Sequence, residues 1–294
     1  MMQLSSKTHL WLAARAMLQE RGDDLFRRWD RARRSFELDD IHDLRVSSRR
    51  LREALALFGP CFPAKSLSRV RSRVKRLTNI LGILRNTDEA ILYFTELAPS
   101  LPTDNIDSLR GLLDELGNER DRERKSLKSG LKELDPVSLR TLFSEACNRP
   151  LIFVETKVDP FVPIHLFLRE AMTGHEASVC DLLPQAVIEA NVNAQHKLRI
   201  VIKHFRYRFE LAAPLISNGF NELHAVFREY QEVLGRLHDL DVFADLVRDR
   251  FDVTAAGPLL ARIAEQRHDQ FTAFERMLVI DPLADLGERV RGLL

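Results

Sequence analysis

The chain has 294 residues, of which 45% are hydrophobic, so it can bury a substantial core in one large domain or two smaller ones. Its 44 lysines and arginines nearly cancel its 43 aspartates and glutamates, so net charge indicates neither nucleic-acid nor membrane binding. The three cysteines are widely separated, which argues against a disulfide framework or a zinc site and is typical of intracellular thiols. No apolar run approaches the roughly 20 residues of a membrane span, and the N-terminus lacks the apolar region of a signal peptide. We therefore expect a soluble, cytoplasmic protein that does not bind membranes.

Helical periodicity covers almost the whole chain, and no convincing alternating strand pattern interrupts it. Breaks rich in proline and glycine divide the chain into helices that we expect over residues 6–35, 38–58, 66–85, 88–98, 104–132, 136–147, 162–172, 180–216, 220–238, 241–250 and 255–279. The stretch 151–163 is expected to be an extended connector, or one short strand. The sequence thus predicts an all-α protein with two helical halves, residues 1–150 and 151–294.

Two blocks of the first half recur in the second half, which is the signature of an internal repeat. The block HDLRVSSRRLR at residues 42–52 returns 154 residues later as HKLRIVIKHFR at 196–206. The block LGILRNTD at 81–88 returns 153 residues later as LGRLHDLD at 234–241. Because charge, apolar type and glycine all match, we expect two similar helical bundles related by an approximate two-fold axis.

The first repeated block places its cations on one side of a helix. At about 100° per residue, these side chains fall within a stripe roughly 80° wide, opposite a set of leucines that would pack into the core. The stripe of the first copy consists of His42, Arg45, Arg49 and Arg52, and that of the second copy of His196, Arg199, Lys203 and Arg206. The helix that follows each stripe carries a related polar face, with Arg71, Lys75 and Arg85 in the first half and His224, Arg228 and His238 in the second.

These faces lack the acidic residues that usually balance them. Between His42 and Arg85 there are 11 basic residues but only two acids, Asp43 and Glu53. Like charges one helical turn apart destabilise a helix by a few tenths of a kcal/mol per pair, so we expect a bound anion to offset the repulsion. Arginine and lysine both suit phosphate groups, and a bound polyanion would favour the protonated form of nearby histidines.

The same motifs resemble those of the CHAD family, the "conserved histidine α-helical domain". The resemblance rests on His42-Asp43-Leu44-Arg45-Val46, on the two Leu-Gly blocks and on Lys203-x-x-Arg206-Tyr207-x-x-Glu210, and it spans essentially the whole chain. It implies two four-helix bundles in a pseudo-two-fold arrangement around a central basic cavity or pore. It also implies binding of inorganic polyphosphate, often at polyphosphate granules, with phosphate or sulfate as mimics.

We therefore expect a binding protein without enzymatic activity, cofactor or metal. The residues expected to contact polyphosphate are the cations, histidines and one tyrosine of the matching faces: His42, Arg45, Arg49, Arg50, Arg52, Arg71, Lys75, Arg85, His196, Arg199, Lys203, Arg206, Tyr207, His224, Arg228 and His238. Arg50 lies about 80° round the helix from His42, on the side away from Arg45, so it belongs either to the binding wall or to solvent.

Two alternatives stay open. The dipeptides His42-Asp43 and His238-Asp239 also occur in HD-type metal-dependent phosphohydrolases, but such chemistry needs further ligands that converge on one metal. The surrounding cations disfavour a divalent ion, and Asp43 points about 100° away from His42. A nucleic-acid-binding protein is the second alternative, because a basic groove does not distinguish phosphodiesters from polyphosphate. Tyr207 is the one aromatic side chain near the stripes that could stack on a base.

Overall fold

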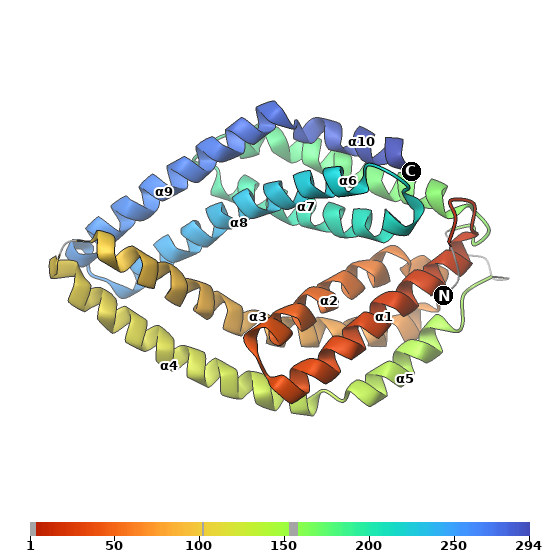
Figure 1. Ribbon diagram of the computed structural model, residues 1–294, viewed down its shortest axis with the longest axis horizontal. Helices are drawn as coiled ribbons and strands as arrows, with labels where there is room; N and C mark the ends of the chain where they lie inside the picture. The colour runs from red at the N-terminus through yellow and green to blue at the C-terminus, as the bar shows by residue number, and fades with distance from the viewer. Residues whose placement is uncertain (1–3, 102, 153–157) are drawn as a thin grey trace.

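The computed structural model describes residues 4–101, 103–152 and 158–294. Within these ranges the chain forms ten α-helices and no β-strand, which confirms the all-α prediction (Figure 1). The helices are α1 (Leu10–Ser35), α2 (Leu38–Leu57), α3 (Ala64–Leu97), α4 (Thr103–Glu133), α5 (Pro136–Cys147), α6 (Ile164–Ala186), α7 (Val192–Ala212), α8 (Phe220–Arg250), α9 (Val253–Ile280) and α10 (Leu286–Leu293). An isolated bridge joins His9 to Pro163, at the end of the expected connector or strand. Residues 153–157 of that stretch lie outside the described residues.

Helices α3 and α8 run without interruption through positions where the sequence predicts a break. Aspartate disfavours a helix interior because its side chain competes for backbone hydrogen bonds, but here each aspartate is held by the next helix. Asp88 of α3 accepts a hydrogen bond from Arg120 Nε of α4 at 2.6 Å, and Asp241 of α8 accepts one from Arg267 Nε of α9 at 2.6 Å. The expected separation into 66–85 and 88–98, and into 220–238 and 241–250, is therefore wrong.

The boundary between α6 and α7 also differs from the prediction. Helix α6 continues to Ala186 instead of ending at residue 172, so the predicted helix 180–216 is wrong in its first part. A turn follows, and α7 begins at Val192 because the Asn191 side chain accepts a hydrogen bond from the Ala194 backbone N–H at 3.1 Å. The short helix α10 lies beyond the last predicted helix.

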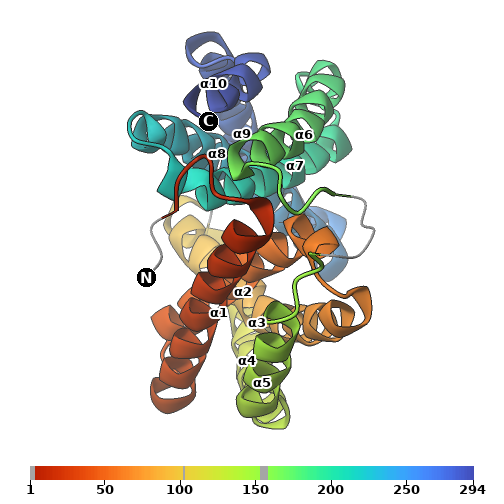
Figure 2. The same ribbon diagram turned by 90° about the vertical axis from the view of Figure 1, so that its right-hand side faces the viewer.

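The helices form two groups that lie on opposite sides of the molecule (Figures 1 and 2). Helices α1 to α5 pack against one another, and so do α6 to α10. The groups meet where α2 lies against α7, where α1 meets α6, and at the far end, where α4 meets α9. Residues 42–52 on α2 and 196–206 on α7 therefore lie at the contact between the two groups.

Three clusters of buried apolar side chains hold these helices together. The first contains Trp29 and Phe58 of the first group, and the second contains Phe209 and Phe227 of the second group. The third joins both groups at the tips of α3, α4, α8 and α9, where the ring of Phe243 stacks on that of Tyr93 with 4.5 Å between centroids. This last cluster fixes the two groups relative to each other, and with them α2 relative to α7.

The apolar side predicted for each cationic stripe is confirmed. Leu44, Leu51 and Leu55 of α2 are fully buried, and so are Leu198 and Ile202 of α7. The stripes consequently point away from the core. None of the described helices combines the length and the apolar character that crossing a membrane requires.

Candidate functional site

The cationic stripes of α2 and α7 come together where the two helix groups meet. The guanidinium groups of Arg45 and Arg49 on α2 lie close enough to Arg199 on α7 for its charge to lower the pKa of both. Beside them opens a pocket of about 500 Å³ with walls from α2, α3 and α7. Its lining consists of Arg49, Arg52, Glu53, Ala56, Arg71, Ser72, Lys75, Lys203, His204 and Tyr207.

Arg45 is the most unusual group of this cluster. Its Nε and Nη1 atoms are buried and have no hydrogen-bond partner among the described residues. Burial and the charges of Arg49, Arg85 and Arg199 together lower the pKa of Arg45 to about 10, against an opposing effect of Tyr207. A buried cation without a partner is costly, because it has lost its hydration and gained no counter-charge. The cluster of cations beside the pocket therefore holds positive charge that the protein itself does not neutralise.

The neighbouring cations share this property. Burial and the charges of Arg49, Arg199, Arg45 and Arg52 together lower the pKa of Lys203 to about 8. Burial also lowers the pKa of Arg199, although Asp239 opposes this shift. Cations from both halves of the chain thus lie close together and form one region of positive charge.

The carboxylates near the pocket are already used. Glu53 is the one acid among the lining residues, and its carboxylate accepts hydrogen bonds from His204 Nδ1 at 2.6 Å and Arg208 Nε at 2.8 Å. Burial would raise the pKa of Glu53, but these two partners outweigh burial and lower it. Because the carboxylate of Glu53 already pairs with Arg208 and His204, it does not pair with the other cations that line the pocket.

Tyr207 forms part of the pocket wall and is itself buried. The guanidinium carbons of Arg49 and Arg206 lie over its ring, 5.5 and 4.8 Å from the centroid. Such cation–π contacts position the two arginines. They also occupy the ring, which leaves it poorly placed to stack on a nucleic-acid base.

The histidines expected at the site differ in their surroundings. His196 and His238 contact each other, with 3.1 Å between their Nδ1 atoms, so at least one of them donates a proton and one is neutral. Burial and the charges of Arg199, His196 and Lys203 together lower the pKa of His238 to about 4. His42 is more exposed, but the part of its ring that is buried and the charges of Arg85 and Arg45 lower its pKa as well.

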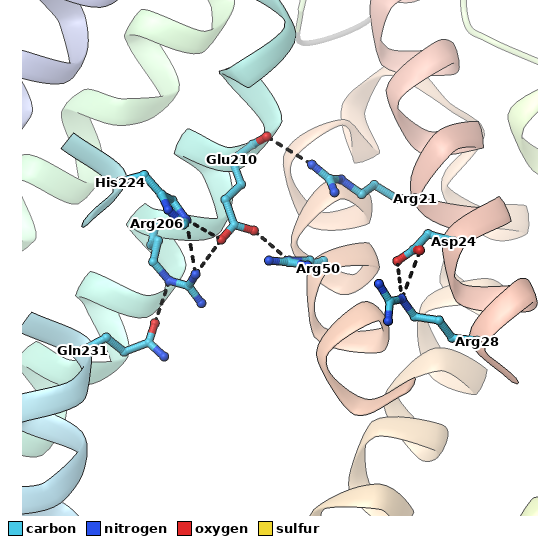
Figure 3. A network of polar contacts seen from close by, with 8 residues as sticks. All are labelled: Arg21, Asp24, Arg28, Arg50, Arg206, Glu210, His224 and Gln231. Atoms are coloured by element: carbon cyan, nitrogen blue, oxygen red, sulfur yellow. Dashed lines mark hydrogen bonds and ion pairs between the residues drawn. The ribbon is translucent and has the colours of Figure 1, made fainter. Parts of the chain in front are cut away.

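Three predicted residues lie in a separate network around the carboxylate of Glu210 (Figure 3). The Glu210 carboxylate accepts hydrogen bonds from Arg50 Nε at 2.8 Å, Arg206 Nη1 at 2.6 Å and His224 Nε2 at 2.9 Å. Arg206 Nε also donates to Gln231 Oε1 at 2.8 Å. Burial would raise the pKa of Glu210, but the hydrogen bond from His224 and the charges of Arg206 and Arg50 lower it to about 2.

This network answers the question that the sequence leaves open about Arg50. Arg50 belongs neither to the wall of the pocket nor to free solvent, because it bridges α2 to Glu210 on α7. Among the predicted residues, Arg50 thus connects the two helix groups, whereas Arg206 and His224 hold Glu210 from within the second group. Sequence reasoning missed the role of Glu210, although it ends the quoted motif Lys203-x-x-Arg206-Tyr207-x-x-Glu210.

The remaining predicted residues lie at the edge of the site. Arg71 and Lys75 are exposed and line the pocket from α3, whereas Arg85 donates from Nε to Glu89 Oε1 at 3.1 Å. Arg228 is exposed on α8 and is not among the residues that line the pocket. The structure therefore brings the stripes of α2 and α7 together most closely, with α3 as the third wall.

The two repeated glycines do different things. A Cβ at Gly235 would meet Arg199 Nε at 3.8 Å, so this glycine lies directly beside a cation of the site. At Gly82 a Cβ would meet no atom within 4 Å. A close approach of a side chain to the backbone thus occurs at Gly235, and the approaching group is Arg199.

Neither HD dipeptide forms a metal site with other described residues. Asp43 forms an ion pair with Arg28 of α1. Asp239 lies near Arg199, and burial raises its pKa. Among the described residues, no three histidine, cysteine, aspartate or glutamate side chains are arranged to hold a metal ion.

Comparisons with known proteins agree with this fold. The model of the CHAD domain matches residues 16–248, well over half of the chain. The crystal structure of the CHAD domain from the plant Ricinus communis is similar over 100% of this chain and 95% of that one, with a TM-score of 0.64 and 20% identity. PptA from Streptomyces chartreusis is similar over 92% of this chain and 99% of that one, with a TM-score of 0.68 and 16% identity. No curated protein gives a significant match. The matched family model establishes that the chain belongs to the CHAD domain family.

Proposed function

We propose that this protein binds inorganic polyphosphate between α2 and α7 without catalysing a reaction on it. The observation that carries the proposal is Arg45, whose buried guanidinium has two unpartnered nitrogens beside Arg49, Arg85 and Arg199. An anion that enters this field supplies the missing hydrogen-bond acceptors and offsets the repulsion between the cations. The CHAD family resemblance points to the same ligand.

A linear polyanion suits the site better than a single phosphate ion. Arg45, Arg49 and Arg52 follow one another along α2 over about 10 Å at 1.5 Å per residue. Arg199 and Lys203 add a second row on α7, and Lys203 also lines the pocket. Five cations in two rows match a chain of repeated negative charges, because successive phosphate groups of one chain can pair with successive cations, so that none of the cations stays unpaired.

We further propose that the repeat gives two pseudo-symmetric bundles, residues 1–150 and 151–294, around a central basic cavity of which the pocket is a part. Two observations support this arrangement. Asp88 and Asp241, at matching positions of the repeat, hold Arg120 and Arg267 in the same way. Arg50 and His204, 154 residues apart, both bond to a carboxylate of the opposite half. We place the protein in the cytoplasm, on polyphosphate granules.

The proposal predicts the effect of removing one central cation from each half. Each charge-assisted contact contributes about 1.5 kcal/mol, so the double variant Arg45→Ala and Arg199→Ala should bind polyphosphate about a hundredfold more weakly. Fluorescence anisotropy with labelled polyphosphate measures this, and circular dichroism checks that helical content is kept.

A matched control removes the same two charges elsewhere. Arg110 and Arg236 are exposed and paired with Asp107 and Glu232 on their own helices. The double variant Arg110→Ala and Arg236→Ala should bind polyphosphate like the unaltered protein. Undiminished binding by the Arg45 and Arg199 variant would overturn the site. Equal displacement of labelled polyphosphate by DNA, RNA and unlabelled polyphosphate at fixed salt would favour a nucleic-acid-binding protein instead.

A further inference from the structure

Lys203 is a chemically distinct amine within the cation field. It lies on α7, lines the pocket and is only partly buried, so small molecules in the pocket can reach it. It forms no hydrogen bond or ion pair with any described residue. The charges of Arg49, Arg199, Arg45 and Arg52 act on it. An amine among other cations loses its proton more easily, and this is one of the ways in which proteins create nucleophilic lysines.

We propose that Lys203 is an acylation site for acyl phosphates, the mixed anhydrides of a carboxylic acid and phosphoric acid. The arginines around the pocket hold the phosphate group of the reagent, which places its carbonyl carbon near the lysine amine. This rests on the proposed function, since the same cations would hold polyphosphate. The product has lost one positive charge at the centre of the site, so acylation should weaken polyphosphate binding.

The reaction is balanced without an oxidant or a cofactor. The lone pair of the neutral Lys203 nitrogen forms a bond to the carbonyl carbon, and the bond from that carbon to the phosphate oxygen breaks. The phosphate leaves with the electron pair of this bond and takes up the proton that the nitrogen releases. An N-acyl lysine and hydrogen phosphate result, and no atom changes its oxidation state.

The pocket favours Lys203 over the other lysines. With a pKa of about 8, roughly a fifth of its amine is neutral at pH 7.4, against about one in a thousand for an ordinary lysine. Lower basicity makes each neutral amine a weaker nucleophile, which leaves a net advantage of about tenfold. Lys197 lies on the same helix but is exposed, and it does not line the pocket, so it is the internal reference.

The test treats the full chain with acetyl phosphate at pH 7.4 and follows acetylation of each lysine by peptide mass spectrometry. We expect Lys203 to be acetylated at least tenfold faster than Lys197, and excess polyphosphate to slow Lys203 but not Lys197. Arg49→Gln should slow labelling of Lys203, whereas Arg110→Gln, far from the pocket in the sequence and paired with Asp107, should not change it. Equal rates at Lys203 and Lys197 would overturn the proposal.

Two further measurements separate this inference from the proposed function. Polyphosphate affinity is measured on unmodified protein, so weak binding there contradicts the proposed function whatever the labelling shows. The same labelling with an uncharged acetyl ester of N-hydroxysuccinimide reports the reactivity of the amine alone. Fast labelling of Lys203 by the ester but not by acetyl phosphate would overturn the role of the pocket in holding the phosphate group. Lys197→Arg should leave labelling of Lys203 unchanged.

Discussion

The Glu210 network should make a measurable, pH-dependent contribution to stability. The Glu210 side chain is 7% exposed and bridges Arg50, Arg206 and His224 across α2, α7 and α8. Lowering its pKa from an ordinary value of 4.5 to about 2 corresponds to about 3 kcal/mol of folding free energy at neutral pH. Glu210→Gln should therefore reduce the free energy of unfolding by about 3 kcal/mol, since it leaves Arg206 buried without a counter-charge.

The pH dependence distinguishes this mechanism from a simple packing defect. Because the pKa is lowered on folding, the contribution is complete above pH 4.5 and is lost as the pH falls toward 2. Urea unfolding should show the gap between the two proteins narrowing by about 2 kcal/mol between pH 4.5 and pH 3. The exposed pair Glu232–Arg236 is the control, and Glu232→Gln should change stability by less than about 0.5 kcal/mol. A gap that stays constant with pH would refute the reasoning.

Three further predictions concern the ligand. Arg45→Met removes a buried cation without a partner among the described residues, so it should raise the free energy of unfolding of the ligand-free protein by about 1 kcal/mol. The same variant should bind polyphosphate more weakly. A lower stability of the variant in urea unfolding would contradict this prediction. A plot of the logarithm of polyphosphate affinity against the logarithm of salt concentration should have a slope of about −3 to −4, because five neutralised charges contribute about 0.7 each. Titrations that show no dependence on salt would exclude an electrostatic site. Burial and neighbouring cations lower the pKa of His238, whereas a bound polyanion favours its protonated form. Polyphosphate affinity should therefore rise as the pH falls from about 7.5 to about 6. Binding calorimetry should show a smaller rise for His238→Gln.

The fold could be predicted from the sequence where apolar periodicity is strong. The buried sides of α2 and α7 follow directly from the spacing of residues such as Leu51 and Ile202. The long helices could not be predicted, because Asp88 and Asp241 favour a break when only their own neighbours in sequence are considered. Their partners Arg120 and Arg267 lie on other helices, 32 and 26 residues away, and a tertiary ion pair of this kind has no local signal.

The site could be predicted as a set of stripes but not as a set of partners. Spacing alone places Arg49 and Arg52 on the same face as Arg45, and all three lie beside the pocket or among its neighbours. Spacing also places Arg206 on the stripe of α7, where the structure turns its guanidinium to Glu210. One turn along the helix separates these two residues, so the motif itself contained the signal that the pair neutralises itself.

At this interface, the cations that pair with carboxylates stabilise the fold, and the cations without such partners are available to bind a ligand. Arg50 and Arg206 share the buried carboxylate of Glu210, and Arg208 holds that of Glu53. The contacts of Arg50 and Arg208 fix α2 against α7 whether or not a ligand is present. Arg45 and Lys203 do not pair with a carboxylate of any described residue, so the unfavourable free energy of burying their charges is offset only when an anion binds. The paired set therefore keeps the unpaired set together against its own repulsion. A variant of the paired set should lower stability first and binding second, and a variant of the unpaired set should do the reverse.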